Sequence, residues 1–152
     1  MNIEDLIKPE LVEISVAAKN WEEAIRAAGK LMVDAGTVEE RFPDAMIRVA
    51  KEFGAYIVVA PGIALPHAQP EDGVIKASIA VVRLKEPVNF GNEDNDPVFL
   101  VIALAAIDHE EHIQGLAEVA NILGDEECIE KLKAARTKEE LRGVFLEKEQ
   151  DM

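Results

Sequence analysis

The sequence predicts an α/β fold in which one mixed β-sheet is covered by helices on both faces, a three-layer α/β/α sandwich. Three observations predict it. Short apolar runs of strand length alternate along the chain with longer segments of helical periodicity. The run 98–106 is continuously apolar, as in a strand buried on both faces. No repeat or linker-like composition interrupts this order, so residues 1–152 are expected to form a single domain.

The amino-terminal third is expected to contain one strand and two long helices. Val12, Ile14 and Val16 alternate with polar residues, which predicts a strand over 11–17 with these three side chains on one face. Helical spacing of apolar residues predicts the rest of this third. The expected elements are a short helical lead-in at 1–10 and helices at 20–36 and 38–53, the second with Pro43 in its first turn.

The remainder of the chain is expected to supply four strands and then only helices. The strands are expected at 56–60, 63–65, 78–84 and 98–106, with a polar surface connection at 86–97. The helices are expected at 109–123, 126–135 and 137–145.

Composition excludes several classes of function. A net charge of −14 argues against nucleic acid and against anionic membrane surfaces, which both require clustered Lys and Arg. The one cysteine, Cys128, excludes an intrachain disulfide and lies among acidic residues that disfavour a thiolate. Neither a signal peptide nor an apolar stretch of about 20 residues is present, so a cytoplasmic protein is expected.

The stretch 61–68 is the first candidate for a functional site. Pro66 has no N–H, so a strand carrying Ile63 to Leu65 must end there, and His67 is expected to emerge at the end of the sheet. A neutral imidazole is a nucleophile near neutral pH, and one ring nitrogen can be held by a neighbour while the other reacts. The alternative is a loop histidine with no function.

The other two histidines lie where the buried strand ends and the next helix begins. A helix N-terminus offers unpaired N–H groups to an anion such as a phosphoryl group. His109 and His112 are three residues apart, unlike the four-residue spacing of helical zinc motifs. A metal-dependent hydrolase using His67, His109 and His112 is nevertheless an alternative. The sequence has no Gly-x-Ser-x-Gly elbow and no glycine-lysine nucleotide loop, which favours a protein that receives its group from another protein.

These two segments resemble a known family. Residues 62–68, Gly-Ile-Ala-Leu-Pro-His-Ala, resemble the active-site motif of the enzyme IIA component of the sugar phosphotransferase system, fructose–mannitol class. Residues 56–62 and 69–73 on either side look most like its ascorbate-type branch. His112-Ile113-Gln114-Gly115-Leu116 resembles the second histidine segment of the family, and the resemblance extends over about 3–146.

The resemblance implies a phosphoryl carrier. By it, His67 accepts a phosphoryl group from the phosphocarrier HPr through Nε2, with Nδ1 held by a backbone carbonyl, and passes the group to a cysteine of an enzyme IIB. His112 would lie near His67 and support the phosphoryl group, and neither a cofactor nor a metal is implied. An alternative function is a regulator of a transporter or transcription factor that uses the same histidine. A homodimer is also open, since members of the family are often dimers. Where many members have an Arg-Glu pair, this chain has Lys51-Glu52, with an arginine at Arg48.

Overall fold

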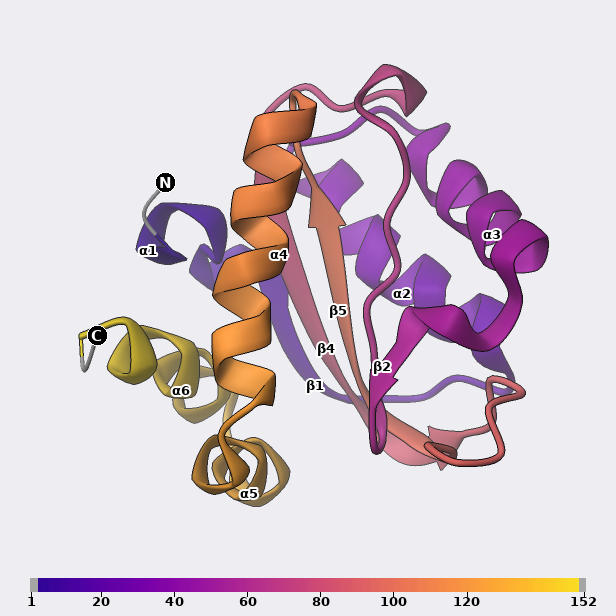
Figure 1. Cartoon of the computed structure of the whole chain (residues 1–152). Coiled ribbons are helices and arrows are strands. Elements are labelled where there is room, and N and C mark those ends of the chain that lie inside the picture. Colours follow the sequence, from indigo (N-terminus) through magenta and orange to yellow (C-terminus); the bar gives the residue numbers. More distant parts are fainter. Residues whose placement is uncertain (1–2, 151–152) are drawn as a thin grey trace.

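A computed structural model describes residues 3–150 and contains a five-stranded sheet of order β1-β4-β5-β3-β2 (Figure 1). The strands are β1 Val12–Val16, β2 Val58–Ala60, β3 Ile63–Ala64, β4 Ser78–Val88 and β5 Val98–Ala105. The α-helices are α1 Ile3–Leu6, α2 Trp21–Asp34, α3 Phe42–Phe53, α4 His109–Leu123, α5 Glu126–Ala134 and α6 Lys138–Gln150. Short 3-10 turns lie at Pro9–Leu11, Gly54–Ile57 and Pro70–Asp72.

Helices cover both faces of the sheet, which confirms the predicted three-layer sandwich. Helices α2 and α3 pack on one face, and α1, α4, α5 and α6 pack on the other, with α4 crossing in front of the strands in Figure 1. Strand β5 is buried on both sides: Leu100, Ile102 and Leu104 face the α4 side, while Val101 and Ala103 face α2. The continuous apolar run of the sequence therefore forms the centre of both cores.

The strands do not all run in the same direction, so their carboxyl ends lie at two opposite ends of the sheet. Strand β3 is parallel to β5, and β1 is parallel to β4, but β4 and β5 are antiparallel. The carboxyl ends of β3 and β5 therefore lie at one end of the sheet, and those of β1 and β4 lie at the opposite end. Ligands of open α/β sheets bind outside the carboxyl ends of strands, so each end is a place to look for a site.

The expectation that Val12, Ile14 and Val16 share one face is wrong for Val16. Val12 and Ile14 pack in the core under α4, whereas Val16 packs in the core under α2. The register shifts between Glu13 and Val16 along β4, and Ser15 has a φ of +54°. Such an irregularity adds a residue to one strand and reverses the alternation that follows it.

Several boundaries also differ from the expected ones. The helix expected from residue 38 begins at Phe42, because Val38 forms a β-bridge with Val74 instead. The strand expected over 56–60 begins at Val58, after a 3-10 turn, and β3 ends at Ala64. Strand β4 continues to Val88, so the connection begins later than residue 86, and the last helix continues to Gln150. Residues 1–2 of the expected lead-in lie outside the described residues.

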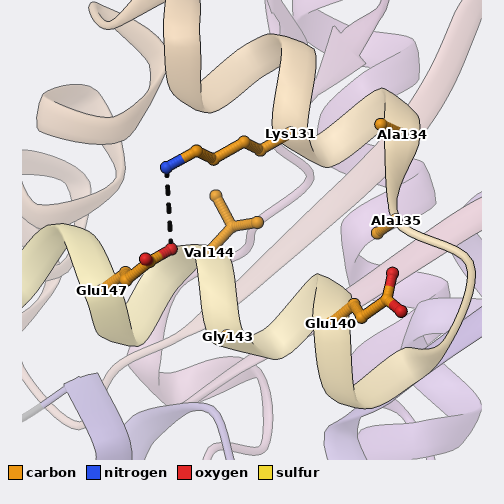
Figure 2. Close-up of a pocket in the computed structure, with 7 residues that line it drawn as sticks. All are labelled: Lys131, Ala134, Ala135, Glu140, Gly143, Val144 and Glu147. Carbon is orange, nitrogen blue, oxygen red and sulfur yellow. Dashed lines mark ion pairs between the residues drawn. The ribbon is translucent and has the colours of Figure 1, made fainter.

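Small side chains line the space between the last two helices. Ala134 and Ala135 face Gly143 and Val144 across a hollow of about 490 Å³ between α5 and α6 (Figure 2). Lys131 Nζ lies 3.7 Å from Glu147 Oε2 across this hollow, as the dashed line in Figure 2 marks. The charge of Lys131 is therefore matched by a carboxylate from the facing helix.

Candidate functional site

A tight turn sets the start of the strand that leads to His67. Gly62 has a φ of +78°, and a Cβ at this position would lie 2.5 Å from the Phe99 ring. Its N–H donates to the Asn95 carbonyl oxygen at 2.8 Å, and its own carbonyl accepts from the N–H of Phe99 at 2.8 Å. Only glycine fits both the backbone conformation and the space. The turn thus fixes β3 against β5.

Strand β3 ends at Ala64, one residue before the expected end, and Pro66 leads the chain to His67 at the end of the sheet. The Pro66 carbonyl accepts from the N–H of Leu104 at 3.0 Å, and His67 lies opposite Leu104 in a parallel bridge. His67 is partly exposed, while Pro66 and Ala68 on either side are buried. The backbone of the histidine is therefore held in the sheet while its ring is accessible.

A backbone carbonyl fixes which ring nitrogen of His67 can react. Nδ1 lies 2.9 Å from the carbonyl oxygen of Leu65. A carbonyl oxygen only accepts hydrogen bonds, so Nδ1 carries the proton in this arrangement. In the neutral ring Nε2 then has the free lone pair, and Nε2 is the nucleophilic atom.

The first turn of α4 brings a second imidazole to His67. Asp108 caps this helix, because its Oδ1 accepts from the N–H of Glu111 at 2.8 Å. Glu111 Oε1 in turn accepts from the N–H of Ile107 at 2.9 Å. The ring centroids of His67 and His112 lie 5.3 Å apart at an interplanar angle of 68°. His67 and His112, which the sequence predicted to lie close together, therefore pack edge to face.

Gly115 allows α4 to lie this close to the sheet. A Cβ on Gly115 would lie 2.8 Å from Cδ1 of Leu104, a side chain that is 1% exposed. His112 is three residues before Gly115 and so lies on the same side of the helix. The glycine sets the height of α4 above β5 and thereby the position of the His112 ring.

The surroundings of His112 favour its neutral form. Burial is the largest cause that lowers its pKa below the ordinary value, and the charges of His67 and His109 lower it further. His109 is exposed, and the ring contact with His67 comes from His112. Within residues 3–150, no group of three His, Cys, Asp or Glu side chains lies close enough to hold a metal ion. The hydrolase alternative thus finds no ligand set in the described chain.

Arg48 and Lys51, the two cations that precede the histidine motif in the sequence, take different positions. Arg48 Nη2 lies 3.0 Å from Oδ1 of Asp72, whose Oδ2 accepts from the N–H of Gln69 at 2.8 Å. Arg48 therefore holds the loop that follows His67. Lys51 points to α2, with Nζ 3.7 Å from Oε1 of Glu22. Asp72 was not singled out from the sequence, although an acidic residue in a Pro- and Gly-bounded loop is a signal for such a contact.

The fold and site define an α/β protein with a partly exposed histidine whose ring is oriented by its own backbone. The chain belongs to the family described as phosphoenolpyruvate-dependent sugar phosphotransferase system, EIIA 2, which matches residues 5–148. It is 37% identical over 139 residues to the ascorbate-specific PTS system EIIA component of Escherichia coli, covering 91% of this chain and 90% of the relative. The corresponding component of Salmonella choleraesuis is 39% identical over 131 residues, covering 86% and 85%.

Solved structures agree with the family and the fold. The mannitol-specific cryptic phosphotransferase enzyme IIA CmtB of Escherichia coli superposes with a TM-score of 0.85 at 30% identity, covering 95% of this chain and 98% of that one. The enzyme IIAMTL in a complex with phosphorylated enzyme IIBMTL, also from Escherichia coli, gives 0.81 at 33% identity, covering 93% and 99%.

These matches confirm the resemblance to the enzyme IIA family, with ascorbate-specific components among the relatives. The chain is a phosphotransferase and a phosphoryl carrier of the sugar uptake system. No helix within residues 3–150 is long and apolar enough to cross a membrane.

Proposed function

We propose that Nε2 of His67 accepts the phosphoryl group of phospho-HPr and passes it to a cysteine of an enzyme IIB during uptake of a sugar, with ascorbate as the leading candidate. The observation that carries this proposal is the 2.9 Å contact between Nδ1 of His67 and the Leu65 carbonyl. It leaves the lone pair on Nε2, the ring nitrogen that is free to meet a phosphorus atom.

The transfer needs no proton movement at His67. The Nε2 lone pair forms the new bond to phosphorus as the bond to the HPr imidazole breaks, and that imidazole leaves with the electron pair. The phosphorylated His67 ring, with Nδ1 still protonated, carries a positive charge that the Leu65 carbonyl stabilises. When a thiolate of the enzyme IIB then attacks phosphorus, His67 departs as a neutral imidazole, which is a good leaving group.

His112 supports the phosphoryl group without holding it too tightly. Its ring lies 5.3 Å from that of His67, and burial lowers its pKa, so it offers a neutral N–H to a phosphoryl oxygen. A full positive charge there would stabilise the phosphorylated state more than the transition state of onward transfer and would slow the relay. Asp108 and Glu111, which cap the same helix, also limit the attraction of the anion.

Both partners have to reach the same partly exposed histidine. Ile107 and Ile113, on either side of the first turn of α4, are 52% and 66% exposed, and Ile75 in the loop after His67 is 58% exposed. Apolar side chains of this size around a reactive centre suit the docking of a protein. The net charge of −14 favours a partner that presents a positively charged surface. The complex of enzyme IIAMTL with phosphorylated enzyme IIBMTL supports an enzyme IIB as acceptor.

With this role we propose a cytoplasmic location for the protein and a single domain over residues 1–152. The transport role is favoured over regulation because relatives at 37% and 39% identity are ascorbate-specific components.

The test is phosphorylation in vitro with phosphoenolpyruvate, enzyme I and HPr. We expect one acid-labile phosphate per chain in the wild type and in His109→Ala, and none in His67→Ala. The His109 variant removes an exposed imidazole from the same region and serves as the matched control. Labelling of His67→Ala to the wild-type level would overturn the assignment.

A further inference from the structure

The opposite end of the sheet has a hollow of about 420 Å³ that is lined by cations. Ser15, Arg83, Lys85, Phe99 and Lys133 contribute to its wall, together with Leu84 and Pro87. We refer to it as the basic hollow. It lies at the carboxyl ends of the parallel strands β1 and β4. Phe99 is five residues before Leu104, the partner of His67, so the two sites are roughly 16 Å apart along β5.

Arg83 holds the end of α5 with one guanidinium nitrogen and has further N–H donors to offer. Its Nη1 donates to the carbonyl oxygens of Leu132 and Lys133, at 3.2 and 3.4 Å, and so caps the carboxyl end of α5. These are its contacts within residues 3–150, and no carboxylate is among them. Nε and Nη2 therefore remain available to a ligand, from a guanidinium whose position is already fixed.

Lys85 and Lys133 add two further positive charges. Lys85 is exposed and makes no ion pair within the described part of the chain. Lys133 Nζ lies 5.7 Å from the centroid of the Phe99 ring and 3.8 Å from Oε1 of Glu130. The pair with Glu130 is exposed on both sides and so contributes little. By contrast, Lys131, at the hollow of Figure 2, is paired with both Glu127 and Glu147.

The wall also offers a hydroxyl and an aromatic face. Ser15 is exposed and has a φ of +54°, a left-handed conformation that costs a non-glycine residue energy and that clusters at binding sites. The partly exposed Phe99 ring suits the apolar face of a small ring. A volume of about 420 Å³ lies in the range of small-molecule sites.

We propose that the basic hollow binds a sugar phosphate. The phosphate dianion would take the free donors of Arg83 together with Lys85 and Lys133, since guanidinium groups match phosphate oxygens in pairs. The sugar ring would lie against Phe99, with one hydroxyl on Ser15. The chain has a net charge of −14, yet three cations line this hollow and, within residues 3–150, Lys133 alone among them has a carboxylate partner, which favours an anion as the ligand. The binding needs no phosphorylation of His67.

The test is titration of the ¹⁵N-labelled, unphosphorylated full-length protein with glucose 6-phosphate, ribose 5-phosphate, inorganic phosphate and glucose. We expect saturable amide shifts at Ser15, Lys85 and Phe99 with both sugar phosphates, at a Kd on the order of 1 mM or below. Inorganic phosphate is expected to bind the same residues several-fold more weakly, and glucose alone is not expected to bind.

Two variants and a control decide whether these cations are responsible. Lys85→Gln should weaken binding about fivefold, and Glu130→Gln, which releases Lys133, should strengthen it about twofold. Lys30→Gln makes the same charge change on α2 and should leave the affinity unchanged. Equal losses in Lys30→Gln and Lys85→Gln would overturn the proposal, as would an absence of saturable shifts at the hollow for all phosphates. Sugar phosphates that bind no more tightly than inorganic phosphate would overturn the sugar part.

Because the protein is unphosphorylated in this titration, its result is independent of the relay at His67. A failure of the phosphorylation assay and a failure of the titration can therefore be told apart.

Discussion

The two carboxyl ends of the sheet differ in the charge and the side chains that they would offer to a phosphoryl group. At the end of β3 and β5, a nucleophilic ring is oriented by a carbonyl, and its neighbour His112 is held neutral. At the end of β1 and β4, three cations surround a hollow that has no nucleophilic histidine in its wall. Charge attracts and retains an anion, whereas a neutral donor leaves it free to move on. Under our two proposals, one sheet carries transfer at one end and binding at the other.

The largest expected effect concerns the turn that fixes β3. Gly62→Ala places a Cβ 2.5 Å from the Phe99 ring at a φ of +78°. We expect a loss of about 3 kcal/mol in the free energy of unfolding, from overpacking and from the left-handed backbone together. Urea denaturation measures it. The matched control is Gly143→Ala in α6, where a Cβ meets nothing within 4 Å, and where stability should rise by about 0.5–1 kcal/mol. Equal effects of the two variants would contradict this account of the turn.

Removal of the second imidazole should mainly slow the chemistry. His112→Ala deletes the neutral donor beside His67, and we expect the rate of phosphorylation by phospho-HPr to fall roughly 100-fold. Rapid-quench kinetics measure the rate, and His109→Ala is the control. The stoichiometry should still reach one phosphate per chain, because His67 is intact. An unchanged rate in His112→Ala would show that the ring contact has no part in transfer.

The spacing between α4 and β5 should matter less than the imidazole itself. Gly115→Ala puts a Cβ 2.8 Å from Cδ1 of Leu104, and because Leu104 is buried we expect α4 to shift outward and carry His112 with it. A shift of a few tenths of an ångström should slow phosphorylation about tenfold. The comparison with His112→Ala is informative, because the double variant should be no slower than His112→Ala alone. Additive losses would place the effect of Gly115 elsewhere.

The smallest expected effect is a pH dependence of stability. The pKa of His112 is lowered in the folded protein, so between that value and the ordinary one near 6.5 the unfolded chain binds more protons. The contribution of His112 is therefore fully present above about pH 6.5 and is lost as the pH falls toward the lowered pKa. Denaturation across this range should show a weaker dependence in His112→Gln. In an NMR titration, His109→Gln should raise the pKa of His112, because one of the charges that lowers it is gone.

The sequence predicted the histidine site better than the other end of the sheet, for physical reasons. Pro66 has no N–H to donate to a neighbouring strand, and this local fact predicts, without knowledge of the fold, that the strand stops before His67. Strand β3 does stop before it, at Ala64. The family resemblance supplied the carbonyl on Nδ1, which the structure has in Leu65. The side change at Val16 could not be predicted from alternation, because the irregularity at Ser15 depends on pairing with β4.

The basic hollow likewise has no local signal. It joins residues from β1, β4, β5 and α5, and each of its cations by itself is an ordinary surface charge. The ion pair of Arg48 with Asp72 is of the same kind, since 24 residues separate the partners. Contacts between distant segments depend on how the layers pack. The local pattern of a single sequence therefore does not predict them.

We propose that Nε2 of His67 carries the phosphoryl group while the proton on Nδ1 stays hydrogen-bonded to the Leu65 carbonyl. The most direct measurement is long-range ¹H–¹⁵N and ³¹P NMR of the protein after phosphorylation by phospho-HPr. We predict one phosphohistidine, at residue 67, with phosphorus on Nε2 and a protonated Nδ1. Phosphorus on Nδ1, or on His112, would contradict the account.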